Sequence, residues 1–155
     1  MRRISGPWDD AAVVRWLTEA RIPVRLAVTT ARGPLVVSLW YRYDDGQLWC
    51  ATRADAVVVG HLRRDPRVGL EVAPDLPPYR GVRGTARATI VPERGAEVLE
   101  ALLARYLDAS NAPLATWLRD RSDDEVAIRL DDLTLSSWDF SARMVAQDGP
   151  VLPTL

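Results

Sequence analysis

The residues best suited to bind a ligand lie in segment 34–53, around an Asp45-Gly46 pair. Asp-Gly between β-forming residues is typical of a two-residue hairpin turn, because that turn needs positive φ. The turn sets a register with these opposing pairs: Asp44 and Gln47, Arg42 and Trp49, Trp40 and Ala51, and Ser38 and Arg53. One face of the predicted hairpin therefore combines a hydroxyl, two indoles and guanidinium groups, with Val36 at its edge. We expect this face to contact a ligand or a second subunit, since a solvent-facing strand pair usually carries more charge and less tryptophan.

The opposite face of the same hairpin is almost wholly apolar. Its members are Leu35, Val37, Leu39, Tyr41, Tyr43, Leu48, Cys50 and Thr52. Alternation of this kind is typical of a strand pair with one face against a core. We therefore expect this second face to be buried.

The types of the charged residues exclude several chemistries. All 20 basic residues are arginine, so a Schiff base on a lysine side chain is excluded and any anion is bound by arginine or backbone N–H groups. The chain has one cysteine and one histidine, His61, so an internal disulfide is excluded and a His/Cys metal cage is not expected. No convincing pair of acid and base residues stands out. The chemistry, if any, is therefore expected to come from a cofactor.

Composition sets the class of protein. The 155 residues, 48% of them hydrophobic and 26% charged, fit one globular domain spanning 1–155. A net charge of −1 gives no general attraction to nucleic acid or to an acidic membrane. The sequence has no apolar run of about 18 residues and no signal-peptide core, so a cytoplasmic protein is expected.

Periodicity predicts the elements that position the hairpin. Segment 1–22 is expected to contain an amphipathic helix, 55–65 a short helix that begins after Asp55, and 145–155 a loose tail. Another helix is predicted by the spacing of Leu99, Leu102, Leu103, Tyr106 and Leu107. A shorter helix is expected to begin at Pro113 and to turn Leu114, Trp117 and Leu118 inward. Strands are predicted at 24–30, 68–72, 79–91, 126–130 and 133–140, in addition to the hairpin. The prediction is an α+β domain built on an antiparallel barrel.

The order of these parts resembles the flavin-binding split β-barrel superfamily, the pyridoxamine 5′-phosphate oxidase-like proteins. Within it, the chain looks most like the flavin- and deazaflavin-dependent reductases. The residues that carry the resemblance are Gly33-Pro34, Ser38-Leu39-Trp40-Tyr41, Asp45-Gly46, Thr52, Leu62-Arg63-Arg64-Asp65-Pro66-Arg67-Val68, Pro78-Tyr79-Arg80-Gly81-Val82 and Gly84-Thr85-Ala86. The resemblance implies a split barrel of about six strands, Greek-key-like, with flanking helices. It also implies a homodimer with two cofactor sites at the subunit interface.

Carried onto this sequence, the resemblance assigns ten residues to a site for FMN or the deazaflavin coenzyme F-420. The ring would contact Ser38, Leu39 and Trp40, and the phosphate would contact Thr52 and Arg53. Arg80 and Gly81 would close on the cofactor, and Trp138 would come from the partner chain. The family commonly has a phosphate-binding lysine where this chain has Val58, and often asparagine where it has His61. No metal is implied.

Three hypotheses follow for the function. The first is an oxidoreductase that transfers hydride or electrons between FMN or F-420 and a small organic substrate. The second is a carrier or sensor of flavin or haem, which the apolar Val58 favours. The third is a dimeric module that has lost its cofactor. The choice between FMN and F-420 stays open, because either the phosphate of FMN or the acidic tail of F-420 could be bound by Arg53, Arg63, Arg64, Arg80 and Arg83.

Overall fold

A computed structural model of the chain describes residues 1–144. The strands are β1 Arg2–Ser5, β2 Val24–Thr30, β3 Gly33–Leu39, β4 Arg42–Asp44, β5 Gln47–Arg53, β6 Arg67–Val72, β7 Arg80–Val91 and β8 Glu125–Asp139. The α-helices are α1 Asp10–Glu19, α2 Val57–Arg64, α3 Gly95–Tyr106 and α4 Ala112–Arg119. Short 3₁₀ turns lie at Pro92–Arg94, Ala109–Asn111, Ser122–Asp124 and Ser141–Arg143. The predicted tail at 145–155 lies outside the described residues.

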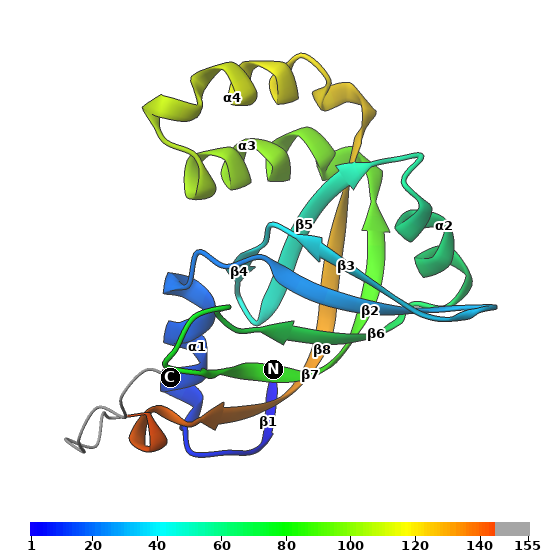
Figure 1. The fold of residues 1–155 in the computed structure, drawn as a ribbon. Coiled ribbons are helices and arrows are strands. Elements are labelled where there is room, and N and C mark those ends of the chain that lie inside the picture. The colour runs from blue at the N-terminus through cyan, green and yellow to red at the C-terminus, as the bar shows by residue number, and fades with distance from the viewer. Residues whose placement is uncertain (145–155) are drawn as a thin grey trace, which may run out of the picture.

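The strands form one sheet in the order β3-β2-β6-β7-β8-β5-β4, antiparallel throughout, and β1 pairs in parallel with β8. The two edge strands, β3 and β4, follow each other in the chain and are separated only by Trp40 and Tyr41. The sheet therefore curls until its edges meet through this one segment. Figure 1 shows α3 and α4 together at one end of the sheet, and α1 and α2 at separate positions around it. The predicted α+β antiparallel barrel is confirmed.

The sheet has eight strands where the sequence predicted about six. Arg2–Ser5 forms β1, although the prediction placed only a helix in 1–22, because a four-residue strand has too few positions to show a period. The predicted hairpin strand is divided into β3 and β4, and the two segments predicted at 126–130 and 133–140 are one strand, β8.

A single apolar core fills the barrel. Alternate residues of β2 point inward and are buried, namely Val24, Leu26 and Val28. The predicted apolar face of the hairpin is confirmed for Tyr41, Leu48 and Cys50, which are fully buried in the same cluster. Helix α1 adds Val13 and Leu17 to the core, and α2 adds Val58, Val59 and Leu62.

The predicted hairpin is right at its turn and wrong beyond it. Asp45 and Gly46 both have positive φ, and the pairs Arg42 with Trp49 and Asp44 with Gln47 are present. Ser38 is not opposite Arg53, because β3 leaves β5 after the break and pairs with β2 instead, with Ser38 opposite Arg25. Trp40 likewise has no strand partner at Ala51. Tertiary pairing with β2 has overridden the local register.

Two helix predictions are corrected in detail. Helix α2 is confirmed, but Asp55 does not cap it, because its carboxylate pairs with Arg53 and Ala56 occupies the N-cap without a side-chain bond. Helix α4 is confirmed, but Leu114 and Trp117 are largely exposed and Ala115 is its buried residue. The eight-residue helix packs mainly on α3, and Ala115 is the one buried residue of α4, so the predicted inward face is only partly covered. Among residues 1–144, no helix is long and apolar enough to cross a membrane.

Buried Cys50 predicts a weakening of the fold at alkaline pH. Burial raises the pKa of its thiol from 9.0 to about 12. Because the unfolded chain ionises first, the stabilisation is complete below pH 9 and is lost as pH rises from 9 towards 12. We expect the free energy of unfolding to fall by roughly 1 kcal/mol between pH 8 and pH 10 through this thiol. Urea unfolding of Cys50→Ala should show that decline removed, and an equal decline in the variant would contradict the assignment.

Candidate functional site

The main candidate site lies where β3 and β5 separate. Beyond Trp49, no strand of the described chain pairs with the edge of β5 that faces β3. A cavity of about 320 Å³, here called the split cavity, opens between the two strands, within the usual range for small-molecule sites. It is lined by Ser38, Leu39, Trp40, Ala51, Thr52, Arg53, Leu99, Leu102, Trp117, Leu118, Arg121 and Glu125.

Five of the ten predicted site residues line this cavity together. Ser38, Leu39 and Trp40 come from the end of β3 and the break after it, and Thr52 and Arg53 come from the end of β5. In a regular hairpin Thr52 would face away from Arg53. Here both reach the cavity, because this edge of β5 has no neighbouring strand to separate its two faces.

Apolar side chains form most of the cavity wall. The Trp40 ring is stacked on Tyr106, with centroids 5.2 Å apart and ring planes 6° from parallel. Leu99 and Leu102 of α3 cover the cavity from one side, and Trp117 of α4 adds an indole that is 52% exposed. A flat, apolar ring system suits such a wall.

Trp49, from the same predicted face as Trp40, is not available to a ligand. It is 4% exposed and packs against Val98, Leu102 and Ala127. Helix α3 therefore covers one part of the hairpin face predicted to bind a ligand or a second subunit, and the split cavity occupies another part.

The break between β3 and β4 is held by one hydroxyl from α3. The Tyr106 hydroxyl accepts a hydrogen bond from the Tyr41 N–H at 3.3 Å, and lies 3.2 Å from the carbonyl oxygens of both Tyr41 and Ile22, to which it can donate. The neighbouring Arg105 donates to carbonyl oxygens of Thr18 and Ala20 at the end of α1. The end of α3 thus fixes the strand break that creates the cavity.

The split cavity has charged groups of both signs. Arg53 donates two hydrogen bonds to Asp55, at 2.9 and 2.8 Å, which hold the pKa of that carboxyl below its usual value. Arg121 lies 4.7 Å from the centre of the Trp117 ring. Burial raises the pKa of Glu125, although Arg53 acts in the opposite direction. The guanidinium group of Arg121, which no ion pair of the described residues neutralises, is therefore the better candidate for an anionic group, and Arg53 would have to share its donors with Asp55.

Val58 and His61 do not line the split cavity. The Val58 side chain is buried in the barrel core, so it would not contact a ligand bound between β3 and β5. The half-buried His61 lies on α2, with its Nδ1 3.1 Å from the Arg64 guanidinium.

The other three predicted residues lie together, away from the split cavity. Gly81 of β7 is opposite Trp138 of β8, and Arg80 is opposite Asp139. The Arg80 guanidinium lies 5.5 Å from the centre of the Trp16 ring on α1. Trp138 has a buried indole N–H without a hydrogen-bond partner in the described chain. A Cβ on Gly81 would lie 2.5 Å from the Val72 carbonyl oxygen, so a close approach to the end of β6 requires glycine there.

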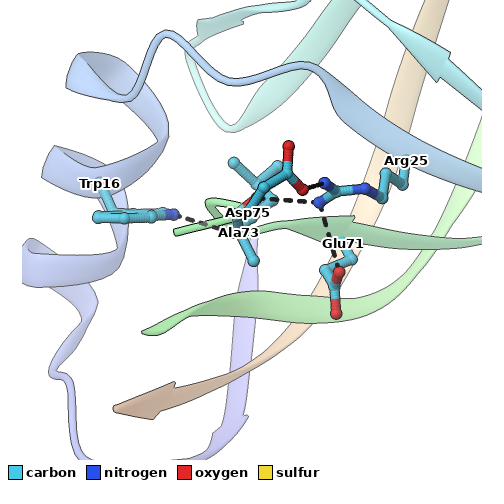
Figure 2. A network of polar contacts seen from close by, with 6 residues as sticks. Trp16, Arg25, Glu71, Ala73 and Asp75 are labelled. Atoms are coloured by element: carbon cyan, nitrogen blue, oxygen red, sulfur yellow. Dashed lines mark hydrogen bonds and ion pairs between the residues drawn. The ribbon is translucent and has the colours of Figure 1, made fainter. Parts of the chain in front are cut away.

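A polar network holds the segment that leads into Arg80 (Figure 2). Trp16 donates to the Val72 carbonyl oxygen at 3.1 Å, which joins α1 to the end of β6. From β2, Arg25 donates to the Ala73 carbonyl oxygen at 2.9 Å and pairs with Asp75 and Glu71. Sequence reasoning missed this network, because its members are far apart in the chain and carry no shared pattern.

The sequence analysis did not assign to a binding site four further residues at or beside the split cavity, namely Trp117, Arg121, Tyr106 and Glu125. Trp117 was predicted to be core, since an indole at helical spacing is usually buried. Its exposure follows from the position of α4 as an outer layer over α3, which the sequence does not specify.

The residues present fit a flavin-type cofactor in part. The stacked Trp40 and the leucines of α3 suit a planar ring, and the hydroxyls of Ser38 and Thr52 can hydrogen-bond its polar edge. Arg53 and Arg121 can bind an anion, although Arg53 would share its donors with Asp55.

Comparisons with known proteins identify the fold. No protein-family model and no curated relative matches the sequence. A conserved hypothetical protein from Mycobacterium tuberculosis is 24% identical, with TM-score 0.72 and coverage of 97% of this chain and 98% of that one. An F-420 reductase is 22% identical (TM-score 0.62, 77% and 93% covered). An FAD-binding protein from Mesorhizobium loti is 20% identical (TM-score 0.62, 84% and 93% covered).

The similarity extends over most of each chain. The chain therefore has the fold of the FMN-binding split-barrel proteins, the pyridoxamine 5′-phosphate oxidase-like group.

Proposed function

We propose that the chain is an oxidoreductase that binds FMN or coenzyme F-420 in the split cavity and acts on a small organic substrate. One observation carries the proposal. Five residues assigned to ring and phosphate on the sequence alone line a single cavity, although they come from two strands that are not paired at that point. The shared fold of an F-420 reductase and an FAD-binding protein supports the same class of ligand.

The chain's own residues would bind and orient the cofactor. A flavin-type ring, when bound, supplies hydride or electron transfer. Leu39, Trp40 and Leu102 would exclude water from one side of the ring, and Ser38 and Thr52 would hydrogen-bond its polar atoms. Arg53 would bind the phosphate, together with Arg121. No protein acid or base is needed for these roles.

We further propose that the chain acts as a homodimer. Gly81 and Trp138 lie away from the split cavity of their own chain, so they would reach a cofactor only from a partner. The exposed side chains of Val36 and Val57 are consistent with a covering subunit. Light scattering during size-exclusion chromatography tests this proposal, and a monomer at working concentration would contradict it.

Replacing Arg53 tests the phosphate assignment. We expect Arg53→Ala to weaken binding of FMN or F-420 at least about tenfold, because it removes a charged hydrogen-bond donor from the cavity. Arg32→Ala is the matched control, since Arg32 is an exposed arginine at the opposite end of β3. Fluorescence titration of both variants measures the effect. Equal affinities would remove Arg53 from the site.

The same titrations separate the proposed function from its alternatives. A carrier would bind the cofactor, but under anaerobic conditions it would not accelerate oxidation of the reduced form by any organic acceptor tried, quinones and nitroaromatics included, beyond the rate of the free cofactor. A module without cofactor would bind neither FMN nor F-420. Saturable binding with acceptor-dependent oxidation is the outcome that the proposal requires.

A further inference from the structure

A second cavity lies between α1 and the start of β7. It measures about 470 Å³ and is lined by Trp8, Ala12, Arg15, Trp16, Glu19, Ala20 and Arg80. Six of these residues recur at intervals of three to four, so they form one face of α1 and its N-terminal approach. Arg80 supplies the facing wall. We call this the α1 cavity; it shares no lining residue with the split cavity.

Two indoles with fixed orientations form the aromatic part of the α1 cavity. The rings of Trp8 and Trp16 are 5.2 Å apart and tilted by 50°. Their N–H groups already donate, Trp8 to Asp139 at 3.2 Å and Trp16 to the Val72 carbonyl oxygen at 3.1 Å. A ligand could therefore contact the two indoles only through their ring surfaces. The hydrogen bonds of the two N–H groups hold these rings in place. Such surfaces favour a flat aromatic group.

Two guanidinium groups supply the polar part. Within residues 1–144, no ion pair joins Arg15 or Arg80 to a carboxylate, and the contact of Arg80 is the Trp16 ring. Other cavity-lining arginines differ in this respect: Arg25 pairs with Asp75 and Glu71, and Arg53 pairs with Asp55. Glu19 is the one acid of the lining, against two arginines. A further carboxylate, Asp139, accepts a hydrogen bond from Trp8, and its pKa is lowered by hydrogen bonding from Ser141 and, without a direct ion pair, by the charge of Arg80. Unpaired guanidinium groups next to an aromatic surface favour a carboxylate or phosphate.

We propose that the α1 cavity is a second binding site, for a planar aromatic ligand that carries a carboxylate or phosphate group. The ring would lie on the indole surfaces of Trp8 and Trp16, and the anionic group would contact Arg15 and Arg80. The site stands on its own lining, so it does not depend on a cofactor in the split cavity.

Calorimetric titration of the full chain tests the site with matched probes. 2-Naphthoate and 2-naphthyl phosphate carry the same ring with two anionic groups, and 2-naphthamide is their neutral counterpart. We expect one or both anions to bind saturably, and the amide at least about tenfold more weakly, because it lacks the charge that the guanidinium groups recognise. The probe that binds more tightly shows whether the natural ligand carries a carboxylate or a phosphate. Equal binding of amide and anions, or no saturable binding of either anion, would overturn the proposal.

Variants then locate the binding. Ala12→Phe should abolish it by filling the cavity, whereas Ala11→Phe places the same ring one position away on an exposed part of α1. Arg80→Gln should weaken anion binding at least about tenfold, and Arg21→Gln, an exposed arginine outside the lining, should not change it. In protein with ¹⁵N-labelled indoles, the Trp8 and Trp16 signals should shift with the anion, also in the presence of excess FMN. Unchanged binding in Ala12→Phe would contradict the location.

Discussion

Gly95→Ala is expected to destabilise the protein by about 3 kcal/mol, although alanine is the better helix former. Gly95 begins α3 with helical backbone angles, so the substitution introduces no backbone strain. A Cβ at this position would lie 2.0 Å from the Glu125 carbonyl oxygen and 2.9 Å from the Val126 nitrogen. Both are backbone atoms of β8, which cannot rotate away. The helix would have to move off the sheet, and Leu99 and Leu102 would move from the split cavity with it.

Gly60→Ala is the matched control for this prediction. Gly60 is also helical, in the middle of α2, but nothing lies within 4 Å of a Cβ added there. Alanine should therefore stabilise the protein by roughly 0.5–1 kcal/mol. Guanidinium unfolding curves measure both changes. If the two variants shifted the transition in the same direction, the close packing of α3 on β8 would be wrong.

Tyr106→Phe is expected to lower the free energy of unfolding by about 1–3 kcal/mol. The variant keeps the ring that stacks on Trp40 and removes only the hydroxyl. That hydroxyl accepts a hydrogen bond from the Tyr41 N–H and can donate its one proton to the carbonyl oxygen of Tyr41 or of Ile22. Since the chain breaks between β3 and β4 at this point, no neighbouring strand replaces the lost bonds. The cavity wall at Trp40 should also loosen, so ligand affinity in the split cavity should fall with stability.

Tyr79→Phe controls for the loss of a tyrosine hydroxyl as such. Tyr79 is 42% exposed, and we expect a change within about 0.5 kcal/mol, as for other surface substitutions. Urea unfolding of the two variants, followed by tryptophan fluorescence, makes the comparison. A Tyr106→Phe protein as stable as Tyr79→Phe would show that the break does not depend on this hydroxyl.

Much of the fold could be predicted, because the apolar residues of its strands and helices recur at the spacing typical of each element. Alternation in β2, in β6 and along β8 specified strands, and Asp45-Gly46 specified the turn between β4 and β5. What failed was the extent of pairing. Beyond Trp49 the sequence still reads as a hairpin, but β3 pairs with β2, a choice set by the curl of the whole sheet. Strand order is a property of many residues at once, and a local pattern does not contain it.

The sequence predicted the residues that β3, the break after it and β5 contribute to the candidate site, but not those of α4. Ser38, Leu39, Trp40, Thr52 and Arg53 were assigned from the resemblance, and the structure gathers them at one cavity. Trp117 and Arg121 could not be assigned, because their role depends on how α4 lies over α3. The indole and guanidinium groups of the α1 cavity were likewise hidden. Trp8 and Trp16 belong to the segment expected to contain an amphipathic helix, and Arg80 comes from a strand more than 60 positions later.

The most direct measurement is an equilibrium titration of the purified protein with FMN and, separately, with F-420. We predict saturable binding of one of them, at one molecule per chain. Amide hydrogen exchange in the complex should slow at residues 38–40 and 51–53, on the two sides of the split cavity. No binding of either compound by a folded protein would contradict the proposed function, and protection confined to other strands would contradict the site.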